Sequence, residues 1–428
     1  MRINESFLSE LLLVYTLDDS AELLAETSEG IPLLWRQEYG AGAFMVFNGQ
    51  MLQYKTNRGL FAGALSKLVP EFTYPVFNSK VVFIDDFPAP LRSGIDQGLY
   101  EDYGRDIPTF YKEVWWPDML KTASRHRLNY TAALIKTFND RVAPPFDDPE
   151  DEDANGLISF GREIIKSGGE IGLHGYNHQP LQSDADTAER LGAAKWNGEA
   201  EMAQSLLATR RYFEEAFPNY NILSYVPPSY VLSDQGREAL KQAFPELASI
   251  SSLYEEDNDG DTYSQEFALA PDGILEMPII TSGYLEKPSV SWAEANGVML
   301  HGYFSHIIHP HDLLDTEINT EGWDRMHESF DSYMARVDRK YPWLRPLTAT
   351  ETAIDMVSVL TSSIEWSVEE DGTRRGSIHP YEGTAYFLMR TERSIVRTDN
   401  CDVRKVDEDL YLIAARGADF ALKLGDSK

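Results

Sequence analysis

The chain has 428 residues, a hydrophobic fraction of 43% and a formal net charge of −31, values typical of a folded, acidic protein of more than one domain. The acidity argues against nucleic acid or anionic lipid as a partner, since binding to either needs basic side chains. The single cysteine, Cys401, excludes an internal disulfide and a cysteine-rich metal site. No apolar run reaches the length of a membrane-spanning helix.

The first region, residues 1–78, predicts a partial α/β arrangement. Its N-terminus combines a short apolar run with acidic neighbours and has no small-residue cleavage site, so we expect no secretory signal there. Apolar runs at 31–35 and 44–48 indicate strands, and the pattern over 56–68 indicates a helix. This order of strand, strand and helix corresponds to the back half of an α/β domain.

The second region, residues 79–350, alternates apolar runs with helical patterns, which predicts a parallel sheet or a barrel-like β/α fold. The third region, residues 351–428, has short β-like runs between charged turns and predicts a small β-rich domain, either a sandwich or a fragment of one. The predicted strands of the second region are 81–85, 130–134, 170–174, 222–226, 247–251, 274–280 and 297–304, and its helices include 116–126, 158–167, 199–217 and 322–338.

Polar residues follow the predicted strands at three places. Asp85 and Asp86 end one strand, and His174 ends another, with His178 four residues further on. The third place is the segment YFSHIIHPHD at 303–312, which is rich in histidine. Because functional side chains gather at the C-terminal ends of strands in parallel β/α folds, we expect these residues to form one site.

Each of these patterns alone has an ordinary structural explanation. Paired aspartates are common in turns and helix caps, and two histidines four apart can simply lie on the surface. One carboxylate combined with two histidines from different strand ends instead favours a metal site with open coordination positions. Such a set suits Zn²⁺ in hydrolysis or Fe(II) in an oxygenase. The α/β pattern and the order of aspartate before His-x-x-x-His favour hydrolysis.

Two motifs carry a family resemblance. The segment FIDDF at 83–87 resembles the TFDD motif of the polysaccharide deacetylase (NodB-homology) superfamily, and HGYNH at 174–178 resembles its HSxxH motif. The resemblance covers residues 79–350 and implies a distorted (β/α)-barrel. At SYVPPSY (224–230), which is similar to the third motif, Val226 stands where the family has an arginine.

The resemblance implies a role for each site residue. Asp85 would be the catalytic base, and the general acid would be a histidine late in the region. We predict His309 for that role, because Pro310 stiffens its position, with His306 as the second choice. The predicted ligands for Zn²⁺, or for another divalent ion such as Co²⁺, Ni²⁺ or Mn²⁺, are Asp86, His174 and His178. His301 is interpreted as a packed strand residue and His311 as a surface residue.

The implied substrate is a polysaccharide. Aromatic side chains can stack on the apolar faces of sugar rings, so several residues near these loops are candidate substrate contacts. Removal of acetyl groups from an amino sugar creates cations, which a protein of net charge −31 would attract. The candidate substrate-binding residues are Tyr176, Pro228, Tyr230 and Tyr303.

The histidine-rich segment resembles that of the divergent exopolysaccharide deacetylases of the Pel and galactosaminogalactan types. This implies an extracellular or cell-envelope location and contact with other components of an exopolysaccharide system. The first region also resembles the tail of a glutamine-amidotransferase-like domain.

We therefore predict a metal-dependent de-N-acetylase of an N-acetylhexosamine-containing polysaccharide. The alternatives are a non-catalytic carbohydrate-binding or scaffold protein on a degenerate deacetylase fold, and a hydrolase of small amides.

Overall fold

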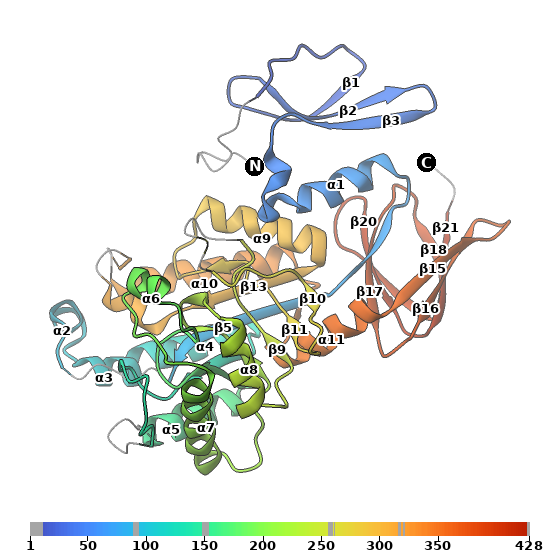
Figure 1. The fold of residues 1–428 in the computed structure, drawn as a ribbon. Helices are drawn as coiled ribbons and strands as arrows, with labels where there is room; N and C mark the ends of the chain where they lie inside the picture. Colours follow the sequence, from blue (N-terminus) through green and yellow to red (C-terminus); the bar gives the residue numbers. More distant parts are fainter. Residues whose placement is uncertain are drawn as a thin grey trace. The chain divides into compact units, whose positions relative to one another are not determined.

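The computed structural model describes residues 12–88, 94–147, 154–255, 260, 262–315, 318–319 and 322–425. These residues form two compact units (Figure 1). Unit 2 holds the described residues within Ser79–Glu286 and Phe304–Val357. Unit 1 holds those within Met1–Asn78, Lys287–Tyr303 and Ser358–Lys428, so it is assembled from three separate stretches of the chain.

The central feature of unit 2 is one long sheet, with the strand order β10-β11-β9-β8-β7-β6-β5-β13-β12 and β14 beside β5. The pairs β5–β6, β6–β7, β7–β8 and β8–β9 are parallel, whereas the edge pair β10–β11 is antiparallel. The two ends of this path, β10 and β12, are not neighbours, so the sheet is an open and distorted barrel. The strands are β5 (Ser79–Phe87), β6 (Tyr130–Ile135), β7 (Glu170–Gly175), β8 (Ser224–Tyr225), β9 (Ser249–Ile250), β10 (Ala268–Leu269), β11 (Leu275–Glu276), β12 (Thr281–Ser282), β13 (Tyr303–Ile308) and β14 (Arg345–Pro346).

Helices separate these strands along the chain, which confirms the predicted α/β class. Their apolar residues recur at helical spacing, as in α10, where Trp323, Met326 and Phe330 are all buried. Capping side chains fix several starts, for example Ser233, whose hydroxyl accepts the Gly236 N–H of α8. The helices are α2 (Gln97–Tyr103), α3 (Ile107–Phe110), α4 (Trp116–His126), α5 (Ala154–Lys166), α6 (Ala185–Leu191), α7 (Glu199–Ala216), α8 (Asp234–Ala243), α10 (Trp323–Lys340) and α11 (Ala349–Thr361), with short helical turns η4 (Tyr111–Trp115), η6 (Pro228–Tyr230) and η7 (Pro310–Leu314).

In unit 1, an antiparallel sheet of order β1-β2-β3 is followed by helix α1, which packs beside α9 (Figure 1). Gly59 allows this close approach, because a Cβ atom there would lie 2.5 Å from the backbone of Asn296. The Asn296 side chain also accepts the Leu60 N–H, at 3.2 Å. The elements are β1 (Ala21–Glu26), β2 (Pro32–Tyr39), β3 (Gly42–Phe47), η2 (Met51–Gln53), η3 (Lys55–Asn57), α1 (Gly59–Leu68) and α9 (Pro288–His301).

The rest of unit 1 is a sandwich of two four-stranded sheets, as the β-rich pattern predicted. Their orders are β15-β16-β21-β18 and β19-β20-β17-β4. Phe387 of β17 and Phe420 of β21 stack with ring centroids 5.6 Å apart in a core shared by both sheets. Cys401 lies buried in the same core, and burial raises its pKa to about 11, which fits a structural thiol. The strands are β4 (Thr73–Val76), β15 (Ser363–Val368), β16 (Thr373–His379), β17 (Ala385–Arg390), β18 (Ile395–Asp399), β19 (Cys401–Lys405), β20 (Leu410–Ala415) and β21 (Asp419–Leu424).

One predicted strand is wrong. The segment 297–304 is the end of helix α9 and the beginning of β13. Gly302, with a φ of 59°, ends the helix in the left-handed conformation, and its N–H donates to Val298. His301 therefore lies at a helix terminus, where its ring stacks on Phe77.

Within the described residues, no helix is both long enough and apolar enough to cross a membrane.

Candidate metal centre

Irregularities in the sheet direct the two aspartates of β5 to the same place. Ile84 pairs with Ala132 and Phe87 with Leu134, so Asp85 and Asp86 together oppose one residue of β6. This is a β-bulge, a feature frequent beside active sites. Asp86 has a φ of 50°, in the left-handed region that aspartate tolerates better than most residues. The bulge breaks the usual alternation of side chains, and both carboxylates reach the same histidine.

That histidine is His174, near the end of β7, where the register with β6 also shifts. Its Nδ1 lies 2.9 Å from Asp85 Oδ1, and its Nε2 lies 3.4 Å from Asp86 Oδ1. Gly175 then turns the chain with a φ of 131°, a conformation that favours glycine. The turn brings His178 back, so that its Nε2 lies 4.0 Å from Asp86 Oδ1. The ligand atoms of Asp86, His174 and His178 all lie within 4.8 Å of one another.

The atoms of this triad fit a divalent metal ion. His174 Nδ1 lies 2.9 Å from the carbonyl oxygen of Val226, a contact that fixes the ring and leaves Nε2 facing Asp86. That Nε2 and the Oδ1 oxygen of Asp86 are buried, yet they have no hydrogen-bond partner among the described residues. Buried polar atoms rarely stay unsatisfied. Two imidazoles and one carboxylate suit zinc and similar ions, and they leave coordination positions open.

Asp85 and His309 form a charged pair beside the triad. Burial alone would raise the pKa of Asp85, but the charges of His174 and His309 outweigh it and hold that pKa well below its usual range. Burial lowers the pKa of His309, but its contact with Asp85 Oδ2, at 3.4 Å, outweighs this and raises the pKa to about 9. At neutral pH the site therefore holds a carboxylate next to an imidazolium, one able to accept a proton and the other able to donate one.

Tyr230 borders this pair from η6. Its hydroxyl lies 3.5 Å from His309 Nε2. Ser229 and Tyr230 have φ values of 52° and 55°, and residues held in this region tend to cluster at functional sites. The carbonyl of Tyr230 accepts the Tyr263 N–H at 2.7 Å. Tyr230 is thus tied to the chain segment that carries Tyr263.

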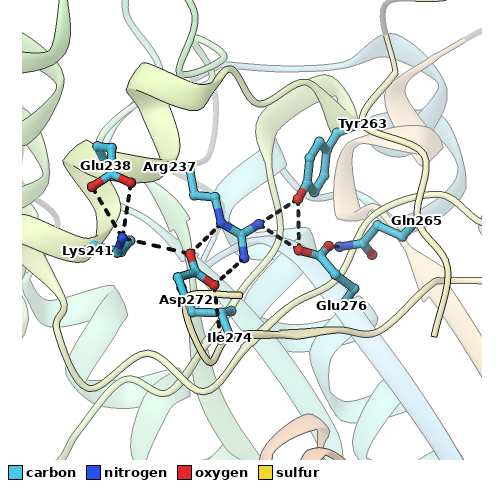
Figure 2. A network of polar contacts seen from close by, with 8 residues as sticks. All are labelled: Arg237, Glu238, Lys241, Tyr263, Gln265, Asp272, Ile274 and Glu276. Carbon is cyan, nitrogen blue, oxygen red and sulfur yellow. Dashed lines mark hydrogen bonds and ion pairs between the residues drawn. The ribbon is translucent and has the colours of Figure 1, made fainter. Parts of the chain in front are cut away.

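A polar network, the Arg237 cluster, holds Tyr263 in turn (Figure 2). Arg237 of α8 donates to the Tyr263 hydroxyl and to Glu276 Oε1, both at 2.6 Å, and it binds both carboxylate oxygens of Asp272. Gln265 donates to the other oxygen of Glu276. These interactions anchor Tyr263, whose N–H binds the Tyr230 carbonyl. We call this network the Arg237 cluster; its members are Arg237, Tyr263, Gln265, Asp272 and Glu276.

The other predicted site residues lie deeper in the protein. His306 is buried within β13, with Nδ1 2.9 Å from the Thr281 hydroxyl and Nε2 2.8 Å from the Gly283 carbonyl. Burial lowers its pKa to about 4. Tyr176 is buried against Phe146.

The remaining two predicted contacts are buried as well. Tyr303 is in unit 1 and packs edge-on against Phe77. Pro228 is buried at the start of η6.

Two residues that were not predicted reach the site. His311, interpreted from the sequence as a surface residue, places Nδ1 2.8 Å from Asp86 Oδ2. Asp312 Oδ2 lies 3.9 Å from His309 Nδ1. The sequence signal for both is their place directly after His309 in the histidine-rich segment.

The fold and the site define an α/β protein with an Asp-His-His candidate metal centre at the end of its strands. The chain belongs to the family DUF2194, described as "uncharacterised protein conserved in bacteria", which matches residues 4–412. No curated protein matches the chain.

Several solved structures are similar to this chain. One is the carbohydrate deacetylase Agd3, with 8% identity, a TM-score of 0.48, and coverage of 95% of this chain and 76% of that chain. Another is a pseudoenzyme of the CE4 family from Bacillus anthracis, with 13% identity, a TM-score of 0.34, and coverage of 67% and 69%. A third is the peptidoglycan deacetylase PdaC from Bacillus subtilis, with 10% identity, a TM-score of 0.31, and coverage of 65% and 92%. Carbohydrate deacetylases, which the FIDDF and HGYNH motifs predict, are thus among the solved structures similar to this chain.

Proposed function

We propose that the protein is a metal-dependent de-N-acetylase acting on a polysaccharide that contains N-acetylhexosamine. The observation that carries the proposal is the Asp86-His174-His178 triad with the Asp85–His309 pair beside it. A site for binding alone needs no such combination of metal ligands, base and acid. The two sequence motifs, FIDDF and HGYNH, supply Asp85, Asp86, His174 and His178 in the order expected for a deacetylase.

The roles of the residues follow from their positions. Asp86, His174 and His178 would hold the ion, which when bound lowers the pKa of a water molecule and polarises the amide carbonyl. Asp85, ionised through its contacts with His174 and His309, accepts the proton of the attacking water. His309, protonated at neutral pH, donates a proton to the leaving amine of the sugar.

The arginine missing from the third motif favours the non-catalytic alternative, because Val226 cannot give Asp85 a cation. In this chain, however, His309 brings its Nε2 to 3.4 Å from Asp85 Oδ2. A cation therefore still faces the base, and the carbonyl of Val226 orients His174 instead. These contacts favour the enzyme over the binding protein.

The substrate class and the location are part of the proposal. The net charge of −31 suits a polymer that becomes cationic as it loses acetyl groups. The resemblance to exopolysaccharide deacetylases supports an extracellular or cell-envelope location and a role beside other components of an exopolysaccharide system.

The test is acetate release from N-acetylglucosamine and from N-acetylgalactosamine, each as the monomer and as oligomers, with added Zn²⁺ and after chelation. We expect metal-dependent release that grows with oligomer length and is lost in Asp85→Asn. Asp85→Asn should still bind zinc, which separates loss of the base from loss of the site. Zinc binding without release from either polymer would contradict the proposed substrate. Release only from monomers would favour the small-amide hydrolase.

A further inference from the structure

We infer that His311 is a positioning residue that orients the carboxylate of Asp86 toward the metal. The inference rests on the proposed metal site. His311 lies on η7, directly after β13, and η7 packs beside β5, which carries Asp86. Its Nδ1 is 2.8 Å from Asp86 Oδ2.

The two oxygens of Asp86 have different surroundings. Oδ1 faces the histidines of the triad, at 3.4 Å from His174 Nε2 and 4.0 Å from His178 Nε2. Oδ2 faces His311. A partner on Oδ2 limits rotation of the carboxylate and keeps Oδ1 directed at the ion, which is how outer residues tune a metal site.

His311 is not itself a member of the triad. The atoms of Asp86, His174 and His178 lie within 4.8 Å of one another, and among the described residues His311 does not complete that group. The side chain of His311 is 53% exposed, whereas that of Asp86 is fully buried. An exposed imidazole that touches a buried ligand on its outer side is placed to orient that ligand.

The expected effect is on metal affinity. Removal of an outer partner of a metal ligand typically weakens metal binding or activity by about 10- to 100-fold. His311→Ala should therefore weaken Zn²⁺ binding by about that factor. Because the amide nitrogen of asparagine can take the place of Nδ1, His311→Asn should recover much of the loss.

The experiment measures the Kd for Zn²⁺ by competition with a chromophoric chelator, in the full chain. His178→Ala serves as the control for loss of a true ligand, and His379→Ala, an exposed histidine of unit 1, as the control for loss of any histidine. We expect affinity to fall in the order wild type and His379→Ala, then His311→Asn, then His311→Ala, then His178→Ala.

The outcomes separate this inference from the proposed function. If wild type binds zinc and His311→Ala binds it equally well, the inference is wrong and the metal site stands. If His311→Ala loses as much affinity as His178→Ala and asparagine gives no recovery, His311 is a ligand, and the positioning role is also wrong. If the wild type itself binds no zinc, both the inference and the proposed function fail.

Discussion

Unit 2 contains two dense polar clusters that are built in opposite ways. In the Arg237 cluster, each guanidinium nitrogen of Arg237 meets an acceptor, and the carboxylates of Asp272 and Glu276 are bound in return (Figure 2). None of the side-chain polar atoms in this cluster is a buried atom without a hydrogen bond among the described residues. Donors and acceptors are matched.

The metal centre lacks this balance. Asp86 Oδ1 and His174 Nε2 are buried without hydrogen bonds in the described part of the chain. Two neighbouring carboxylates, Asp85 and Asp86, share the centre with several histidines, and their pKa values are displaced. A matched cluster stabilises the fold, whereas an unmatched one at the strand ends is complete only with a ligand.

The largest expected difference between the clusters is their response to zinc. A ligand that binds only the folded state stabilises it by about 4 kcal/mol at a thousand times its Kd. We expect excess Zn²⁺ to raise the free energy of unfolding by about that amount in wild type and in Arg237→Met. His174→Ala should lose most of the gain. The measurement is urea unfolding with and without zinc. An equal gain in His174→Ala would place the ion elsewhere.

His306 should behave as a structural residue, although it lies in the same histidine-rich segment as His309. Its pKa is about 4 in the folded protein, against an ordinary value of 6.5. The unfolded chain therefore binds the proton first as the pH falls. The contribution of the neutral His306 ring to the free energy of unfolding is fully present above about pH 6.5. It is lost as the pH falls toward 4, which lowers the free energy of unfolding by about 3 kcal/mol.

The check is chemical unfolding of metal-free protein at pH 7 and pH 4.5. His306→Gln cannot be protonated, so its stability should fall less than that of wild type over this interval. A parallel fall in both proteins would show that His306 does not carry the pH dependence.

Arg237→Met should destabilise unit 2 through the matched cluster. The change removes the guanidinium that binds Asp272 and Glu276, and both side chains are largely buried. Lys241, whose Nζ lies 4.0 Å from Asp272 Oδ2, replaces it only in part. Because some solvent still reaches them, we expect a loss of about 2 kcal/mol. Glu276→Gln, which keeps an acceptor for Arg237, should cost less. The zinc Kd should be unchanged in both variants, and a large change would show that the two clusters are coupled.

The sequence predicts the regular parts of this fold well. Helix α4 spans Trp116–His126, as predicted, because its apolar spacing is clear. The strand 297–304 was wrong because a short apolar run with a glycine fits both a helix end and a strand. Strands β8, β9 and β11 are only two residues long, whereas the apolar runs that predicted them are longer. In these segments the buried residues extend beyond the two residues that pair in the sheet, so the apolar pattern is longer than the strand.

The candidate site is only partly visible in the sequence. The two motifs contain Asp85, Asp86, His174 and His178, whose ligand spacing is local. The residue types do not indicate the bulge at Asp85 and Asp86. Val226 contacts His174 through its backbone oxygen, so the identity of its side chain does not predict this contact. His311 was missed because a helical turn, η7, decides which of several neighbouring histidines faces the site.

The smallest effect is expected from a change at Tyr230, which contacts both the Arg237 cluster and the metal centre. Its carbonyl is bound by Tyr263 of the Arg237 cluster, and its hydroxyl lies 3.5 Å from His309 Nε2. Because that contact is long, Tyr230→Phe should lower kcat only about 3- to 10-fold, or about 1 kcal/mol, and leave the zinc Kd unchanged. Steady-state kinetics on the longest accepted oligomer measures this effect. A loss of a thousandfold would make the hydroxyl a direct participant in the reaction. No loss at all would show that the matched cluster supports the fold and does not help to position His309.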